Sequence, residues 1–377
     1  MNKRILLVVI ALAILVALTA PARAGSERIE RTLEYETAMK AGQSIHIENL
    51  LGSLIVRADE THGKVLIEAQ VITEADVKAT AKALNESIEL EEDEQDGVPV
   101  VRVRYPLDRH SAFRLPRSER DGLLDKWVNP IVRKSTLAVV YDGQTVEVGQ
   151  SKGAAVVAVH VKVTLPLDVN ASLKQVAGNL QVVGVRGEFS LEAVDGHIVA
   201  EQVYGSMRVR TGGGEVIVRK FGGEGFRLQT ASGNVTLMEV KADTASLRAG
   251  SGKIEGSGIS TDSLEVDSGA GGVFLDDVDS VSVTVASESG EVDISTLLTR
   301  TREASIRAAM GNVTLRVNKT TPFELRALAE SGSVKHRDVS AEVIDEEKNS
   351  LHMIRGKGGG ATLEINTGKG AVMIRPI

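Results

Sequence analysis

The chain contains no cysteine. Disulfide bonds, a thiol nucleophile and cysteine-ligated metal sites are therefore excluded. Lipid attachment to an N-terminal cysteine is excluded as well. The folded chain must gain its stability from the burial of apolar side chains and from backbone hydrogen bonds.

Aromatic residues are scarce. They make up 3% of the 377 residues, and Trp127 is the one tryptophan. Sugar-active enzymes usually offer aromatic platforms to their substrates, so this scarcity counts against that class. It favours a narrow interior filled by valine, isoleucine, leucine and alanine.

Long apolar runs are missing except at the N-terminus. Lys3-Arg4 precedes an apolar run over residues 5–20, and Pro21-Ala22-Arg23-Ala24 follows it. This order is typical of a secretory signal peptide, predicted over residues 1–24 with cleavage after Ala24. An uncleaved anchor is the alternative, although the run is short for a membrane span of ~20 residues. We expect an exported protein of the periplasm or cell surface with no membrane span after cleavage.

A strong charge of either sign is also missing. Without Lys3, Arg4 and Arg23, 41 basic residues remain against 51 acidic ones, a net charge of −10. Such a mildly acidic chain has no global attraction for nucleic acid or for an anionic membrane.

Glycine is abundant, with 37 residues, and it recurs at a fixed spacing. Six glycines stand nine residues apart, at positions 178, 187, 196, 205, 214 and 223. From Gly196 onward the steps are 18 to 21 residues, and the last step, from Gly332 to Gly370, is 38 residues, or about two coils. Between the glycines, apolar and polar residues alternate, which is typical of strands with one buried face.

A fixed period of this length indicates stacked units. We predict an all-β, single-stranded β-solenoid (β-helix) with about two strands per coil of 18–21 residues. A sandwich of short strands is the alternative, but sandwich loops vary more in length. The phase of the alternation places eight residues inside the solenoid: Val182, Leu191, Ile198, Val209, Val218, Leu228, Val235 and Leu247.

We expect one β-solenoid domain over residues 25–377, with its regular repeat over 171–377. The run Asn49–Val56 matches the later units, so the solenoid is predicted to begin there. One short helix is expected at about 74–87, with Thr73 as its N-cap and with Val77, Ala81, Leu84 and Ile88 on its apolar face. Residues 106–135 hold three prolines and many charges, and are predicted to be a surface loop insertion.

These segments resemble the bacterial "putative adhesin" β-repeat family of exported proteins with a domain of unknown function. The resemblance lies in the strand Gly52–Val56, the helix that begins at Glu74, the strand Val161–Asn170 and the units of the type Ser232-Gly233-Asn234-Val235-Thr236-Leu237. It implies a β-repeat fold and, by analogy, binding to a surface or polymer. It carries no catalytic signature.

Motifs for catalysis, metals or cofactors are not found. Asp276-Asp277-Val278-Asp279 is the densest acidic cluster and is interpreted as a solvated corner, and the seven histidines have no metal-ligand spacing. The corner glycines are not followed by the aspartates of calcium-binding repeats, and no helix follows Gly212-Gly213-Gly214 as a phosphate loop requires. We predict no catalytic residue, no cofactor and no metal.

Arginines recur at outward positions with the coil spacing. They would form one stripe, with a break at Glu265 and Asp267, whose members are Arg208, Arg210, Arg227, Arg248, Arg307 and Arg326. Stacked like charges are unfavourable, so the stripe suggests that an anionic polymer binds along it. The alternative is a set of ordinary salt bridges with Glu192, Glu324 and Gln229.

Trp127 and the arginines of the insertion, Arg109, Arg114, Arg117 and Arg120, are added to this hypothesis as a second polymer-binding segment. The sequence therefore predicts a non-enzymatic exported scaffold or adhesin-like binding protein. Its partner would be an envelope polysaccharide or another envelope protein. The alternative is a glycan-active β-helix enzyme, a polysaccharide lyase or hydrolase.

Overall fold

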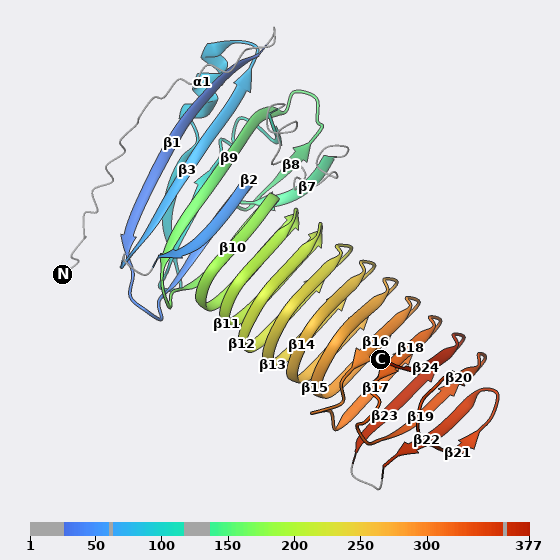
Figure 1. Cartoon of the computed structure of the whole chain (residues 1–377). Helices are drawn as coiled ribbons and strands as arrows, with labels where there is room; N and C mark the ends of the chain where they lie inside the picture. Colours follow the sequence, from blue (N-terminus) through green and yellow to red (C-terminus); the bar gives the residue numbers. More distant parts are fainter. Residues whose placement is uncertain (1–25, 60–62, 117–135, 357–359) are drawn as a thin grey trace. The chain divides into compact units, whose positions relative to one another are not determined.

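The computed structural model describes residues 26–59, 63–116, 136–356 and 360–377. The chain divides into two compact units, residues 1–197 and 198–377. In the described part, α1 (Lys78–Glu86) is the one helix and all other regular elements are strands (Figure 1). None of the described helices has the length and apolar character that a membrane span needs. The predicted signal peptide lies outside the described residues.

The second unit begins with five long strands that stack in parallel, drawn from green to orange in Figure 1. They are β11 (Ile198–Gly213), β12 (Val216–Thr230), β13 (Val235–Ala249), β14 (Ile254–Ser268) and β15 (Val273–Ser287). Each strand pairs in register with the next, so that Val216 lies opposite Val235 and Val235 opposite Ile254. This arrangement confirms the all-β, β-solenoid-like architecture.

Each of these coils is one strand with a bend. The bend falls on a residue with left-handed backbone, such as Lys220 (φ 56°), Glu239 (φ 56°) and Asp277 (φ 54°). Pairing skips this residue and also a second position further along, such as Glu224 in β12 and Asp243 in β13, so each of the strands β12–β15 has three arms. Two separate strands per coil are therefore not confirmed; the coil contains three arms of one strand.

The interior of the stack follows the predicted phase. All eight residues predicted to lie inside are buried, with exposed fractions of 1% or less. The outward neighbour of Val235, Thr236, is half-buried. Branched aliphatic side chains therefore stack in rows through the coils, as the scarcity of aromatic residues suggested.

Glycines form a ladder at one corner of the second unit. A Cβ atom on Gly233 would lie 1.8 Å from the carbonyl oxygen of Gly214, and one on Gly252 would lie 1.8 Å from that of Gly233. The same crowding continues through Gly271, Gly290 and Gly311. Neighbouring backbones thus approach so closely that no side chain fits between them. The buried hydroxyl of Ser268 donates a hydrogen bond of 2.6 Å to the Gly271 carbonyl and closes one such corner.

The last coils do not stack in the order of the sequence. Their strands are β16 (Val292–Thr296), β17 (Glu303–Ala308), β18 (Val313–Val317), β19 (Phe323–Ala329), β20 (Val334–His336), β21 (Glu342–Glu346), β22 (Ser350–Arg355), β23 (Ala361–Thr367) and β24 (Val372–Pro376). The last two strands lie between earlier ones: β23 pairs with β17 on one side and β19 on the other, and β24 pairs with β18 and β20 (Figure 1). In the glycine ladder Gly370 accordingly lies between Gly311 and Gly332. The expectation of two coils between Gly332 and Gly370 is wrong.

The first unit combines parallel and antiparallel strand pairs. β2 (Ser44–Asp59) pairs in parallel with β10 (Asn170–Asp195), with Gly52 opposite Gly178. β9 (Ala155–Pro166) pairs with β2; β3 (Lys64–Ala75) and then β1 (Glu27–Ala38) follow antiparallel. β5 (Val98–Arg104) also pairs with β2 and carries β4 (Glu89–Gln95).

Two local predictions for this unit need correction. Thr73 is not the N-cap of the helix, because β3 runs on to Ala75 and Thr73 is buried with its hydroxyl donating to the Ala81 carbonyl (2.8 Å). Val77 precedes α1 and is 59% exposed, whereas Ala81, Leu84 and Ile88 are buried as expected.

The predicted surface loop 106–135 starts differently from expectation. Residues 112–114 form β6 (Ala112–Arg114), which pairs with β8 (Gln144–Gly149) and β9, and Phe113 is fully buried. β8 forms a hairpin with β7 (Thr136–Tyr141). The other described residues of the segment are 106–111, 115 and 116.

Candidate functional site

The predicted arginines lie on one surface of the second unit, the outward side of the last arm of each coil, which is residues 225–230 in β12. We name this surface the arginine wall. Its two columns, in stacking order, are Arg208, Arg227, Ser246, Glu265, Thr284, Ser305, Glu364 and Arg326, and Arg210, Gln229, Arg248, Asp267, Ala286, Arg307, Asn366 and Leu328.

The register corrects the single stripe to two columns. Arg208 lies directly opposite Arg227, but Arg227 lies opposite Ser246, and Arg248 lies opposite Gln229 in the other column. Spacing alone could not separate positions two residues apart along the strand. The wall is basic in its first three coils and mixed in charge from the Glu265–Asp267 coil onward.

Some arginines of the wall are paired and others are not. Arg248 lies 3.4 Å from Glu265, and Arg326 lies 2.8 Å from Glu324, which fits the salt-bridge alternative at these two positions. Within the part of the chain that the structure describes, no ion pair involves Arg208, Arg210, Arg227 or Arg307. The salt-bridge alternative therefore does not account for the basic end of the wall.

A trough of about 480 Å³ crosses five coils at the mixed end of the wall. Its lining includes small residues such as Ala286 and Gly368 and the exposed side chain of Leu328. The charged lining residues are Asp267, Glu288, Arg307 and Glu330, and none of them has an ion-pair partner among the described residues. The trough thus combines hydrogen-bond acceptors, one guanidinium group and an apolar patch.

The sequence contains a signal for this trough. Glu288-Ser289-Gly290 and Glu330-Ser331-Gly332 are the same corner motif, so their glutamates occupy equivalent positions. The backbone hydrogen bonds Met310 N to Glu288 O and Ser331 N to Gly368 O place both corners in one stacked series. The spacing of the two motifs in the sequence does not indicate that their corners lie close together, because the insertion of β23 changes which coils are neighbours.

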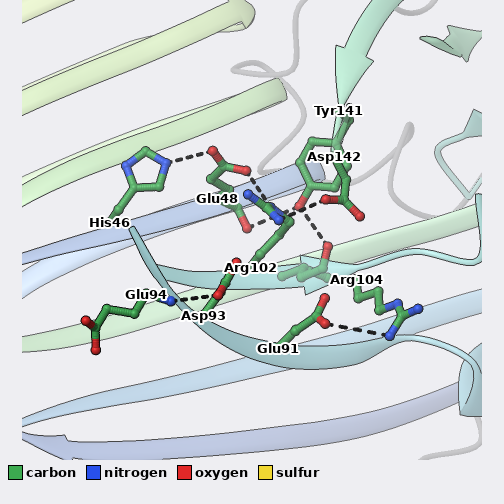
Figure 2. A network of polar contacts seen from close by, with 10 residues as sticks. His46, Glu48, Glu91, Asp93, Glu94, Arg102, Arg104, Tyr141 and Asp142 are labelled. Atoms are coloured by element: carbon green, nitrogen blue, oxygen red, sulfur yellow. Dashed lines mark hydrogen bonds and ion pairs between the residues drawn. The ribbon is translucent and has the colours of Figure 1, made fainter. Parts of the chain in front are cut away.

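A second group of polar side chains lies in the first unit (Figure 2). Glu48 of β2 accepts hydrogen bonds from His46 Nε2 (2.7 Å) and from Arg102 Nε on β5 (2.7 Å), and Arg102 also donates to Asp142 (2.8 Å). The Tyr141 hydroxyl donates to the Val103 carbonyl at 2.7 Å. These bonds join β2, β5 and the β7–β8 hairpin, so the group holds the strands together.

Burial and charge act on the ionisable members of this group. Burial alone would raise the pKa of Glu48, but the hydrogen bonds from His46 and Arg102 and the charge of Arg102 outweigh it and lower the pKa to about 2. Burial raises the pKa of Tyr105 and of Tyr141 far above the usual value for a phenol. Both phenols stay protonated and serve as hydrogen-bond donors.

Acid should therefore weaken the first unit through Glu48. Its pKa is lower in the folded than in the unfolded chain, so its contribution is complete above about pH 5 and is lost as the pH falls toward 2. A shift from 4.5 to about 2 corresponds to roughly 3 kcal/mol. We expect Glu48→Gln to lower the free energy of unfolding by this order at pH 7 and to flatten its decline between pH 5 and 3, measured by urea unfolding.

The matched control for this prediction is Glu91→Gln. Glu91 of β4 is partly exposed, lies 3.7 Å from Arg104 and stands opposite Arg102 in the register of β4 and β5. Its replacement should change the free energy of unfolding by less than about 0.5 kcal/mol. Equal losses in the two variants would contradict the assignment of the acid response to Glu48.

The arrangement closest to a catalytic pair is Ser53 and His160. The Ser53 hydroxyl lies 2.9 Å from Nδ1 of His160 on the neighbouring strand. This pair alone does not make a catalytic serine, because a nucleophilic serine also needs an orienting group and an oxyanion site. Among the described residues no group of histidines and carboxylates could hold a metal ion.

The insertion segment brings two of its predicted binding residues into the described part. Arg109 is exposed beside Asp108 at 3.6 Å, and Arg114 lies in β6. Neither residue belongs to the arginine wall. Trp127, Arg117 and Arg120 lie outside the described residues.

Residues 198–375 match the family model described as Toastrack DUF4097. The match covers the second unit almost completely, and it confirms the predicted resemblance to a β-repeat family with a domain of unknown function. No curated protein matches this chain.

Three solved structures resemble the chain at low identity. A "putative adhesin" from Bacteroides fragilis is 11% identical, with coverage of 92% of this chain and 97% of that one and a TM-score of 0.32. A "putative lipid binding protein" from Parabacteroides distasonis is 12% identical, with coverage of 94% and 97% and a TM-score of 0.34. A "putative cell adhesion protein" from Clostridium sporogenes is 13% identical, with coverage of 92% and 100% and a TM-score of 0.17. Likenesses of this degree carry no argument about a ligand.

Proposed function

We propose that this chain, whose second unit is a Toastrack DUF4097 domain, is an exported, non-enzymatic binding scaffold of the cell envelope. Its arginine wall would bind an acidic polysaccharide that runs along the stack. One observation carries the proposal: Arg208, Arg210 and Arg227 stack on the wall without an ion-pair partner among the described residues.

Stacked unpaired arginines are unfavourable without a counter-charge. Neighbouring coils lie about 4.8 Å apart, and like charges directly opposed destabilise a sheet. A polymer with regularly spaced carboxylates or phosphates would relieve this repulsion, because a guanidinium group can form two parallel hydrogen bonds to each such group.

The trough suggests that the polymer is a glycan. The second column of the wall runs through Arg210, Gln229 and Arg248 into the trough at Ala286 and Arg307. In the trough the carboxylates of Asp267, Glu288 and Glu330 can accept hydrogen bonds from hydroxyl groups. A ligand that carries both anionic groups and hydroxyl groups fits this surface, with its anionic groups at the basic end of the wall and its hydroxyl groups in the trough.

The triple variant Arg208→Gln, Arg227→Gln, Arg248→Gln tests the proposal. We expect its affinity for polygalacturonate, measured by calorimetry with residues 25–377, to fall roughly ten- to a hundredfold, since each exposed pair contributes up to about 1 kcal/mol. Binding to the parent should weaken with salt, because exposed charges are screened beyond ~8 Å at physiological ionic strength.

The control removes three arginines from other surfaces, by Arg104→Gln, Arg186→Gln, Arg337→Gln. This variant has the same net charge as the first and should bind polygalacturonate like the parent. If both triple variants lose affinity equally, net charge and not the wall determines binding, and the proposal fails.

A glycan-active enzyme is the second candidate, and the trough is the observation that favours it. A groove with clustered carboxylates is what glycoside hydrolysis requires, with one carboxyl as acid and another as nucleophile or base. The test is the release of reducing ends from polygalacturonate by the purified protein. If the parent protein releases reducing ends, and if Asp267→Asn, Glu288→Gln and Glu330→Gln abolish this release, the protein is an enzyme. The non-enzymatic proposal is then overturned.

A further inference from the structure

The C-terminal coil, residues 361–377, occupies an internal place in the stack. On one side β23 and β24 pair with β17 and β18, and on the other side they pair with β19 and β20. Residues 318–356, which include β19 and β20, precede the C-terminal coil in the sequence. Residues 361–377 thus lie between coils that precede them in the sequence.

The segment 323–355 is joined to the rest of the stack through this coil. In the described part of the chain β20 pairs only with β24, and β19 pairs only with β23 and β22. β22 in turn carries β21, which belongs to the same segment. By strand pairing, none of these four strands reaches β17 or β18 except across β23 and β24.

When the C-terminal coil pairs with the stack, it closes a longer loop of chain than other coils close when they stack. Asn312 Oδ1 accepts a hydrogen bond from Ala371 N, 59 residues later, whereas the equivalent bond from Lys253 N to Asn234 Oδ1 spans 19 residues. Pairing of more distant residues costs more chain entropy and forms more slowly. Coils that contact only their neighbours can form before it.

The same coil completes the trough. Asn366, Thr367 and Gly368 line it between Arg307 of β17 and Leu328 of β19. Without β23 the two sides of the trough would lack their middle row.

We propose that residues 361–377 enter the stack last, together with the segment 323–355 that pairs with the stack only through them, and that the trough forms only when they have entered. The C-terminal coil then couples the binding surface to the closure of the stack. The stacking order stands by itself, while the use of the trough for a ligand rests on the proposed function.

Gly370→Ala tests this coupling in the full mature chain. A Cβ at position 370 would lie 1.9 Å from the Gly311 carbonyl oxygen, so native insertion is blocked at that corner. We expect hydrogen exchange, followed by mass spectrometry, to accelerate roughly a hundredfold or more in β19, β20, β22, β23 and β24, while β12–β14 keep the parent rates. Lys369→Ala, at the exposed neighbouring position, is the control and should leave all rates unchanged.

Two outcomes of this exchange experiment overturn the proposal. Persistent protection of β19 and β20 in Gly370→Ala would show that they do not depend on the C-terminal coil. Loss of protection throughout β12–β14 would show that the coil is not a separate step.

Refolding of the parent protein provides a second readout that needs no variant. Pulse labelling should find amides of β12–β14 protected first, and those of β19, β20, β23 and β24 later and together. Earlier protection of β19 and β20 than of β23 and β24 contradicts the proposal. If the parent protein fails to bind polygalacturonate, the proposed function fails, but these exchange results still decide the order of insertion.

Discussion

Replacement of Gly252 by alanine is expected to unfold most of the second unit. The added Cβ would lie 1.8 Å from the Gly233 carbonyl oxygen, and 2.5 Å from its carbonyl carbon. Both atoms belong to the backbone of the neighbouring coil, so no side-chain rotation can relieve the clash. Separation of the coils would break the hydrogen bonds at this corner, and we expect a loss of at least about 4 kcal/mol in the free energy of unfolding, measured by urea unfolding with circular dichroism.

Gly225→Ala is the matched control for this prediction. A Cβ there would meet its nearest atom, the Thr244 hydroxyl oxygen, at 3.9 Å, which is ordinary contact. Alanine in this strand should be neutral or should stabilise the protein by up to about 1 kcal/mol, because it restricts the unfolded chain. Similar losses at positions 252 and 225 would show that close backbone approach is not the reason for the glycine repeat.

The second large effect is expected for Val235→Asp. Val235 is 1% exposed and stacks between Val216 and Ile254. A carboxylate at this position would be buried without a partner between apolar rows, which typically costs several kcal/mol. The melting temperature of the variant should fall far below that of the parent.

Thr236→Asp, one residue further and on the outward side, should cost less than about 0.5 kcal/mol. Its neighbours across the strands are Ile217 and Glu255. An equal fall in melting temperature for the two aspartate variants would mean that the assignment of inward and outward residues is reversed.

Periodic features of the fold could be predicted from the sequence because each coil repeats the same local requirements. The corner glycines indicate that the backbones of neighbouring coils approach too closely for a side chain. The alternation around Val209 or Leu228 indicates which residues face inward. Both signals depend only on neighbouring residues along the chain. The likeness of the run around Gly52 to the later units could be recognised in the same way, although its partner Gly178 is distant in sequence.

Features that depend on which coils become neighbours could not be predicted. The insertion of β23 places Asn366 beside Arg307, and no local pattern encodes that choice. The arginine stripe failed for a related reason: the spacing between Arg227 and Arg248 is near one coil, but the register differs by two residues. The N-cap prediction at Thr73 failed because its hydroxyl satisfies the Ala81 carbonyl from within a strand.

The arginine wall is the proposed binding surface. Arginine-selective chemical modification of the mature protein, followed by peptide mass spectrometry with and without polygalacturonate, tests it directly. We expect the polymer to protect Arg208, Arg210, Arg227 and Arg307, while Arg104 and Arg186 react at unchanged rates. Equal protection of all these arginines, or protection confined to Arg104 and Arg186, would contradict it.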